Sequence, residues 1–200
     1  MQSLTVIENV TLDGVMQAPG RPDEDTRDGF ADGGWAVPFG DEVLGRAMGE
    51  RMSCGGGLVL GRRTYEDFAA YWPRQRDDNP FTPVLDATTK YVVSGTLRDP
   101  LPWQNSRLLG GDAAGAVAAL KREPGPGIGV LGSGELVRTL MAHDLVDEYV
   151  LLIHPLVLGT GRRLFADGGP PSSLRLESSA TTTTGVIMAT LRPSRREEDR

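Results

Sequence analysis

Apolar positions recur along this chain with two periods, and the switches between them predict an alternation of strands and helices. From Leu4 to Val10 apolar and polar residues alternate, as on a β-strand, and Asp13-Gly14 provides turn chemistry after it. Short apolar runs bounded by glycine or polar residues predict further strands at 58–60, 90–94, 107–109 and 128–131. Three more strands, at 148–153, 174–178 and 186–191, follow one another with no helix between them.

Between the early strands the apolar spacing becomes helical. Residues 41–52 place one apolar stripe on a helix of about three turns, made of Val43, Leu44, Ala47, Met48 and Met52. A second helix is expected to begin near Thr64, because Thr64 and Asp67 match the capping-box pattern. An alanine-rich helix over 112–121 has Asp112 as its cap. A helix over 135–142 presents an apolar side made of Leu136, Val137, Leu140 and Met141.

This order of elements predicts the fold class. Strands that alternate with helices are joined by right-handed crossovers into a parallel sheet, and the helix-free strands at the end should extend that sheet antiparallel. We therefore expect an α/β protein with a central mixed, mostly parallel sheet. Residues 1–192 are expected to form a single domain, and residues 193–200 a loose C-terminal tail with little apolar content.

Composition narrows the range of partners. The chain has 21 Lys and Arg against 27 Asp and Glu, a formal net charge of -6, so it lacks the basic field that holds nucleic acid. A single cysteine, Cys54, excludes an intrachain disulfide and a Cys-based zinc cluster, which suits a reducing cytosol. No apolar run approaches the roughly 18 residues of a membrane helix. We expect a cytoplasmic protein with no metal and no membrane partner that acts on a small molecule.

The stretch GVLGSGELVRTL, residues 129–140, is the first candidate for chemistry. A strand that stops at a glycine turn and feeds a helix leaves backbone N–H groups pointing outward beside the positive end of the helix dipole, which suits a phosphate. Its glycines match neither G-x-G-x-x-G nor a P-loop, so neither a Rossmann domain nor a P-loop NTPase is favoured. Taken alone, the turn Gly132–Gly134 fits a phosphate seat and a purely structural corner equally well.

Two further strand exits favour the phosphate interpretation. GRRTYE, residues 61–66, places Arg62 and Arg63 at a helix start, although most arginines are simply solvated. KYVVSGTL places Ser94 at the end of another strand. Because ligands bind at the carboxyl ends of the strands in open α/β sheets, these three exits should converge on one edge.

Asp41, which follows WAVPFG, has two interpretations. A carboxylate at a helix start most often caps the helix, but Asp41 could also face a substrate pocket beside Trp35 and Phe39 and help to deliver a proton. The loop over residues 15–40 is long and acidic, and it is either a solvated surface or a lid. Neither His143 nor His154 has a partner at metal spacing, so both are interpreted as structural.

Over nearly its whole length the chain resembles the dihydrofolate-reductase-like superfamily, and most closely the reductase domain of bacterial riboflavin biosynthesis proteins. The resemblance rests on VTLDG, VLGRRTYEDF, KYVVSGTL and the block over residues 129–165. It implies a three-layer fold of about eight strands and an NADPH-dependent reductase. The zinc deaminase signatures of the bifunctional riboflavin enzymes are absent from the sequence, so a stand-alone reductase-like domain is expected.

The resemblance also implies roles for particular residues. Gly61, Arg62, Thr64 and Ser94 would hold the phosphates of NADPH. The turn and helix start made of Gly132, Ser133, Gly134, Glu135 and Leu136 would lie against its pyrophosphate and nicotinamide ribose. Asp41 would be the catalytic carboxylate, with Trp35 and Phe39 against the substrate.

The leading hypothesis is therefore hydride transfer from NADPH to a C=N or C=O bond of a small heterocyclic substrate, pterin-like or pyrimidine-like, or of a simple carbonyl compound. The alternatives are a non-catalytic nucleotide-binding module of the same fold and a dimeric scaffold, and a homodimer is expected because the family often pairs through its late strands. The orientation of Asp41 discriminates between them. A carboxylate that caps its own helix and points away from the cofactor crevice favours the non-catalytic alternative.

Overall fold

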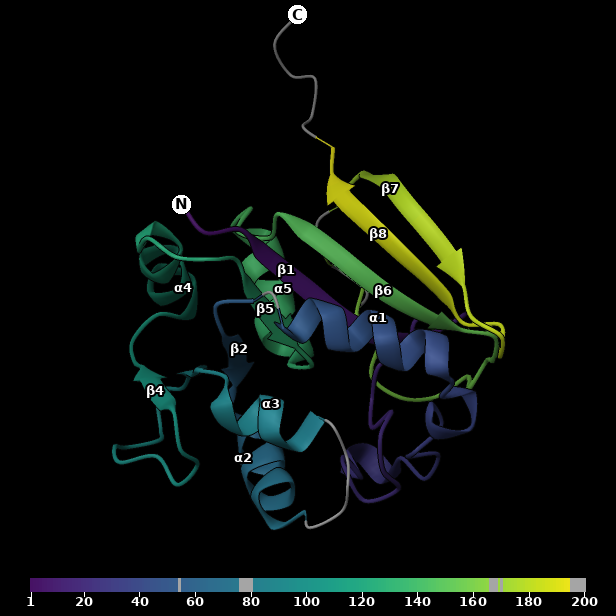
Figure 1. The fold of residues 1–200 in the computed structure, drawn as a ribbon, viewed down its shortest axis with the longest axis horizontal. Helices are drawn as coiled ribbons and strands as arrows, with labels where there is room; N and C mark the ends of the chain where they lie inside the picture. Colours follow the sequence, from purple (N-terminus) through teal and green to yellow (C-terminus); the bar gives the residue numbers. More distant parts are fainter. Residues whose placement is uncertain (54, 76–80, 166–168, 170, 195–200) are drawn as a thin grey trace, which may run out of the picture.

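The computed structural model describes residues 1–53, 55–75, 81–165, 169 and 171–194. Cys54 and the expected tail beyond residue 194 therefore lie outside the described residues. The described strands form one eight-stranded sheet in the order β4-β3-β2-β5-β1-β6-β8-β7 (Figure 1). The strands are β1 (Leu4–Thr11), β2 (Leu58–Gly61), β3 (Lys90–Val93), β4 (Ser106–Leu109), β5 (Ile128–Leu131), β6 (Glu148–His154), β7 (Leu174–Thr181) and β8 (Ile187–Pro193).

The strand directions confirm the predicted fold class. All pairings among the first six strands are parallel, whereas β8 runs antiparallel to both β6 and β7. The strands β7 and β8 thus form a hairpin that extends the sheet beyond β6, as the helix-free end of the sequence predicted. The protein is an α/β fold with a mixed, mostly parallel sheet.

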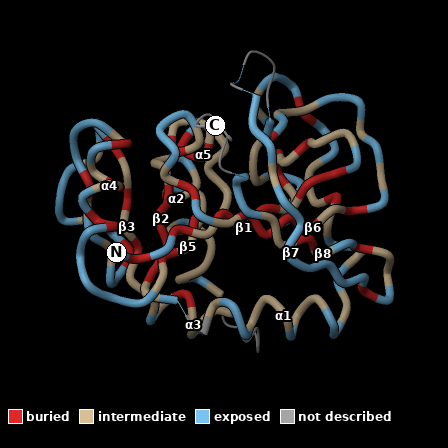
Figure 2. The backbone as a smooth tube through the Cα atoms, turned by 90° about the horizontal axis from the view of Figure 1, so that it is seen from above, coloured by how far each residue is buried: buried red, intermediate tan, exposed pale blue. Residues whose placement is uncertain are grey.

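Helices cover both faces of this sheet. They are α1 (Glu42–Ser53), α2 (Arg62–Tyr71), α3 (Phe81–Ala87), α4 (Ala113–Arg122) and α5 (Gly134–Ala142), with single 3-10 turns at Arg27–Gly29, Val37–Phe39 and Trp72–Arg74. Figure 2 shows α1 and α3 on one side of the strands and α4 and α5 on the other. Right-handed crossovers produce this division, because β2→β3 and β4→β5 run across the sheet in opposite directions.

Both faces of the central strand β1 are buried, since it lies between β5 and β6 under helices on each side. Leu4, Val6 and Val10 join the core cluster that contains α4 and α5 residues. Ile7 points the other way, into a smaller cluster against which Leu44 and Met48 of α1 pack. Burying both faces of a strand is typical of the middle of a parallel sheet.

The predicted helices begin within two residues of their expected starts, but two details of the prediction were wrong. Val43 does not belong to the buried stripe of α1, since the helix packs through Leu44 and Met48 and leaves Val43 40% exposed. The short helix α3 was not predicted, because its sequence FTPVLDA is too short to show a helical period. The helix α2 begins at Arg62, close to the start expected near Thr64.

Within the described residues no helix is long and apolar enough to cross a membrane. The described part of the chain also holds no group of three or more His, Cys, Asp or Glu that could share a metal ion.

Candidate active site

The carboxyl ends of β5 and β2 lie level with Glu8 in β1, which continues for three more residues to Thr11. Strands β1 and β5 are in register up to the pair Ile7–Leu131, and β5 and β2 are in register at Val130–Val59. One step further along, Glu8, Gly132 and Gly61 therefore form a row across the three strands. We call this side of the molecule the carboxyl edge.

Ser133 ties two of these strand exits together. Its hydroxyl accepts a hydrogen bond from the Gly61 N–H at 2.9 Å and donates one to Thr64 Oγ1 at 2.8 Å. Ser133 has the left-handed φ of +70°, which a residue other than glycine adopts only where the surrounding structure enforces it. A Cβ on the preceding Gly132 would lie 3.1 Å from Thr64 Cγ2, so this glycine allows the close approach.

The predicted capping box at the start of α2 was wrong. Gly61 occupies the cap position and gives no side-chain cap, so Thr64 lies within the first turn of the helix. Its hydroxyl accepts from Ser133, and Asp67 instead pairs with Arg21 at 2.5 Å. The local sequence favoured a cap, but the side chains of Thr64 and Asp67 bind residues 69 and 46 positions away in the sequence instead.

The N-termini of α2 and α5 consequently meet at the carboxyl edge. Each helix start directs backbone N–H groups and partial positive charge toward this edge. Arg62, in the first turn of α2, forms an exposed pair with Glu66 at 2.8 Å, and Arg63 is exposed. Two helix N-termini beside two accessible guanidinium groups suit a ligand with more than one phosphate.

Ser94 follows β3, whose last residue, Val93, pairs with Gly61. Its hydroxyl accepts from the N–H groups of Thr96 and Leu97 at 3.1 and 3.0 Å and so shapes the turn after the strand. The third exit thus lies next to the start of α2. The predicted convergence of the three exits on one edge is confirmed.

Side-chain environments separate the predicted cofactor residues into two groups. The side chains of Thr64, Ser94 and Ser133 lie at the edge itself. Leu136 is buried in the core and can serve a ligand only through its backbone, whereas the Glu135 carboxylate is exposed and pairs with Arg138 at 2.6 Å. The cofactor-binding role of the whole set stays a prediction.

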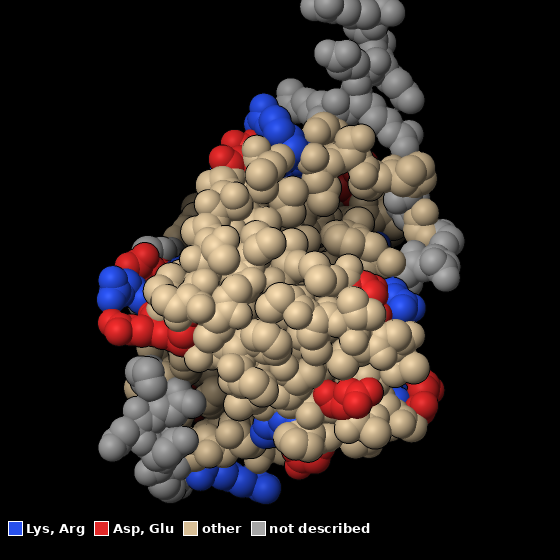
Figure 3. Space-filling view, turned by 90° about the vertical axis from the view of Figure 1, so that its right-hand side faces the viewer, with Lys and Arg blue, Asp and Glu red and all other residues tan. Residues whose placement is uncertain are grey.

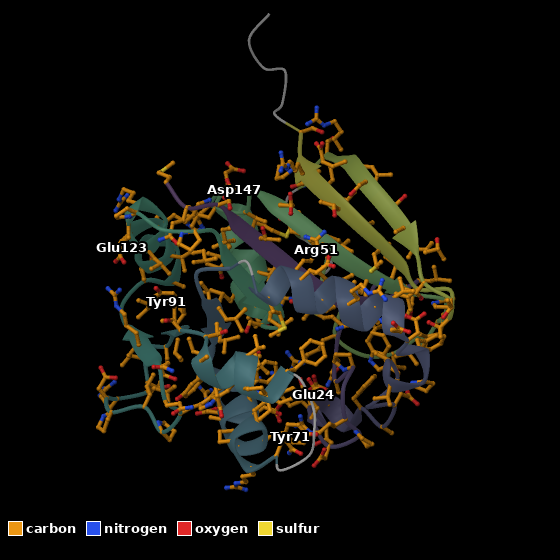
Figure 4. All side chains as sticks on the ribbon, viewed as in Figure 1. Glu24, Arg51, Tyr71, Tyr91, Glu123 and Asp147 are labelled. Atoms are coloured by element: carbon orange, nitrogen blue, oxygen red, sulfur yellow. The ribbon has the colours of Figure 1, made fainter. Side chains whose placement is uncertain are left out.

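The long loop after β1 crosses the carboxyl edge. Near its start, Met16 packs so closely on α5 that a Cβ on Gly134 would lie 2.7 Å from the sulfur. Further on, Arg21 reaches α2, where it pairs with Asp67 and lies 4.2 Å above the centre of the Tyr71 ring. Figure 4 shows Glu24 of this loop and Tyr71 of α2 on the same side of the molecule.

Trp35 and Phe39, the predicted substrate residues, meet around His154 on the α1 side of the sheet. Their rings stand edge-on to the imidazole, with centroids 5.1 and 5.4 Å away. His154 is fully buried, its Nε2 lies 3.0 Å from Asn9 Oδ1, and its Nδ1 has no partner. Burial lowers the pKa of His154 to about 4, so the ring is neutral at pH 7. These three rings form an aromatic wall, and whether it contacts a substrate stays a prediction.

Asp41 caps its own helix. One carboxylate oxygen accepts from the Leu44 N–H at 2.8 Å, and the other accepts from the Thr183 N–H and hydroxyl at 2.7 and 2.6 Å. The hydrogen bond from the Thr183 side chain is the main cause that holds the pKa of Asp41 well below its usual range. Both oxygens of Asp41 accept hydrogen bonds and the carboxyl group is ionised. This is how a capping carboxylate is bound, whereas a proton donor must be protonated.

Glu8 is a residue of the edge that the sequence reasoning did not select. It is 4% exposed, and one carboxyl oxygen has no hydrogen-bond partner. Burial raises the pKa of Glu8 well above its usual value, and the nearby charge of Glu24 raises it further. The signal was present in the sequence, because Glu8 occupies the same alternation as the buried Leu4, Val6 and Val10.

A separate hollow of about 460 Å³ lies at the opposite edge, between the N-terminus and β8. Its charged lining groups are already paired, Lys121 with Asp147 at 2.5 Å and Arg192 with Glu148 at 3.0 Å. Figure 4 shows Asp147 at the end of the molecule away from Glu24. The unpartnered carboxyl and the helix N-termini lie at the carboxyl edge, so the candidate site is placed there.

Sequence comparison relates the chain to one protein family and two relatives. The family model described as the RibD C-terminal domain matches residues 2–188. Two uncharacterized proteins of Bacillus subtilis (strain 168) are similar. YyaP is 30% identical over 136 residues, which cover 65% of this chain and 70% of YyaP. YwjB is 32% identical over 122 residues, 61% of this chain and 65% of YwjB, so the match spans slightly less than two thirds of YwjB.

Solved structures share the fold at low sequence identity. A Shewanella sp. PV-4 protein provisionally described as a riboflavin biosynthesis protein superposes with a TM-score of 0.63 and 19% identity, covering 97% of this chain and 100% of that one. A pyrimidine reductase-like protein from Corynebacterium diphtheriae gives 0.61 and 13%, covering 97% and 92%. At these identities the likeness is evidence of the fold alone.

Proposed function

The chain belongs to the RibD C-terminal domain family, as its resemblance predicted, and from that premise we propose that it is an NADPH-dependent reductase. In this proposal a hydride passes from the cofactor to a C=N or C=O bond of a small heterocyclic or carbonyl substrate. The hydride chemistry belongs to the cofactor, and the protein supplies binding and orientation. A reductase-type role follows from the family, whereas the cofactor and the substrate class are the proposal.

The observation that carries the proposal is the Ser133 link between two strand exits. Through Gly61 and Thr64 it fixes the N-termini of α2 and α5 beside each other at the carboxyl edge. A dinucleotide pyrophosphate needs several N–H donors at short range, and two adjacent helix starts provide them. The left-handed backbone of Ser133 supports the same conclusion, because such conformations cluster at ligand sites.

Arg62 and Arg63 support a preference for the 2′-phosphate. Guanidinium groups bind phosphate dianions through paired, charge-assisted hydrogen bonds. Both arginines are accessible at the start of α2, and Arg62 is held only by an exposed pair with Glu66, which a ligand can replace at small cost. NADPH should therefore bind more tightly than NADH.

The experiment is a comparison of cofactor affinity in Arg62→Ala and Arg46→Ala by calorimetry. Arg46 is a matched control, since it also forms an exposed i,i+4 pair with a glutamate, Glu42, but in α1. We expect Arg62→Ala to weaken NADPH binding by about tenfold or more, the usual scale for one charge-assisted contact, with less effect on NADH. Arg46→Ala should bind as the wild type does. A wild-type protein that binds neither cofactor at millimolar concentration would refute the proposal.

The capping role of Asp41 favours the non-catalytic alternative as a second candidate. A module that binds the nucleotide without turnover would show NADPH affinity but no NADPH oxidation with dihydrofolate, a ribosylamino-pyrimidine or simple carbonyls. Turnover with any of these would exclude the second candidate.

A homodimer remains part of the proposal. Figure 3 shows a face on the side of the β7–β8 hairpin whose middle is largely free of charged side chains. β7 is the edge strand of the sheet, and Leu176 and Ile187 on the hairpin are 56% and 40% exposed. Sedimentation at low concentration tests it, and a sedimenting monomer would contradict it.

A further inference from the structure

Glu8 is an acid placed where the sheet opens onto the candidate site. It follows Ile7, whose partner Leu131 is the last residue of β5, so Glu8 lies level with Gly132 at the start of the glycine turn. In the alternation of β1 its side chain leaves the sheet on the α5 side, with Val6 and Val10. Gly132, the residue level with Glu8 directly after β5, has no side chain. The Glu8 carboxyl therefore lies beside the glycine turn, on the α5 side of the sheet.

Burial of the Glu8 carboxyl is energetically unfavourable, and no described contact of the carboxyl compensates for it. Glu8 is buried between Val6 and Val10 of the main apolar cluster and pairs with Leu151 of β6, and one of its oxygens has no partner. Burying a carboxyl without its hydrogen bonds is unfavourable, because the group loses its contacts with water and gains none from the protein. A leucine at this position would join the same cluster at no such cost.

The side chains around the edge leave few acids for a reduction at neutral pH. Asp41 is ionised and fully hydrogen-bonded, and the His154 ring is neutral because burial lowers its pKa to about 4. Glu24 and Asp67 have raised pKa values through burial, but Glu24 accepts from the Gly20 and Arg21 N–H groups. Asp67 also has one oxygen without a partner, but its other oxygen is paired with the Arg21 guanidinium, which favours the carboxylate. Glu8 remains, because burial raises its pKa well above the usual value and one of its oxygens has no partner, with no ion pair to Glu8 among the described contacts.

We propose that Glu8 is the general acid of the reduction, an inference that rests on the proposed NADPH-dependent function. As the substrate carbon receives the hydride, the electron pair of its C=N or C=O bond moves to the nitrogen or oxygen, and Glu8 gives that atom its carboxyl proton. The cofactor leaves oxidised, and Glu8 is left as a carboxylate that regains a proton from solvent. Glu24, whose charge raises the pKa of Glu8, is partly exposed.

The Met16 side chain covers the glycine turn in the structure. It packs against Gly134 and against the same apolar cluster as Glu8. The Met16 side chain is unbranched and adapts easily, so it can give way to a ligand bound at this turn. The loop start would therefore shift when the cofactor binds.

Infrared spectroscopy of the protein with each cofactor form tests the placement without a substrate. The C=O stretching band of protonated Glu8 should be present in the free protein and with NADPH. It should be lost with NADP⁺, because a positively charged ring nearby favours the carboxylate. Glu8→Gln should remove this band, and Glu42→Gln, which changes an exposed glutamate of α1, should leave the response of the band unchanged. Cofactor binding without any change in the band would overturn the inference while leaving the proposed function intact. Absence of binding would overturn both.

Kinetics test the proton transfer itself. With a carbonyl acceptor, Glu8→Gln should lower kcat by about 10²–10⁴-fold, the usual contribution of a general acid, with cofactor affinity unchanged. With an N-alkylated iminium acceptor, which takes a hydride without a proton, the same variant should keep the wild-type rate. Equal losses with both acceptors would show that Glu8 is merely structural. If Glu8→Gln does not fold, the wild-type pH profiles decide, since only carbonyl reduction should fall as Glu8 ionises.

Discussion

Ser133 shows how one side chain joins segments that are far apart in the sequence. Its hydroxyl contacts Gly61 and Thr64, 72 and 69 residues away, and its left-handed φ directs that hydroxyl toward α2. The sequence identified the glycine turn as a phosphate seat or a corner, and the structure makes it a junction between two helix starts. The GSG sequence alone does not predict this junction, because the pairing of β2 with β5 determines which residues the Ser133 hydroxyl contacts.

Two substitutions at this residue separate hydrogen bonding from backbone strain. Ser133→Ala removes both hydrogen bonds and keeps the strained backbone, so it should lower the free energy of unfolding by about 1–3 kcal/mol. Ser133→Gly removes the same bonds but relieves the left-handed strain, and should lose about 1 kcal/mol less. Urea unfolding measures both. Equal stability of Ser133→Ala and the wild type would contradict the proposed role of the junction.

At the scale of elements, Asp41 fastens α1 to the far end of the sheet. Its carboxylate caps the helix through Leu44 and holds Thr183 in the turn between β7 and β8. Thr184 adds a second tie, since its hydroxyl donates to the Phe39 carbonyl at 2.6 Å. The aromatic wall of Trp35, Phe39 and His154 lies beside this connection. Asp41 and Phe39, which directly precede α1, thus anchor the start of this helix to the β7–β8 turn.

Asp41→Asn should therefore act on stability and its pH dependence, with NADPH affinity unchanged. The pKa of Asp41 is lowered in the folded state, so its contribution is present above the unfolded pKa of about 4 and is lost as the pH falls. The variant should unfold at a lower temperature than the wild type at pH 7, and the difference should shrink below about pH 4. Thermal unfolding across this range measures it. A variant that keeps wild-type stability at pH 7 but loses turnover would restore Asp41 as the catalytic carboxylate.

At the scale of the whole molecule, the sequence predicted the layers well and the contacts across the site poorly. Periodicity located β1, β5 and α5 because each pattern is local. It misassigned Thr64 as a cap and passed over Glu8, since both depend on which strands become neighbours. In a strand with one face in water Glu8 would be unremarkable, and only the position of β1 between two layers of helices makes it a buried acid.

The central claim is that the carboxyl edge of the sheet binds NADPH. Mapping of backbone amide shifts by nuclear magnetic resonance, on the isotope-labelled protein with and without NADPH, tests it most directly. Shifts should concentrate at the three strand exits, residues 61–64, 94–97 and 132–136, and at Met16 in the loop above them. Shifts confined to the opposite edge, around Gln2, Lys121 and Asp147, would contradict the account.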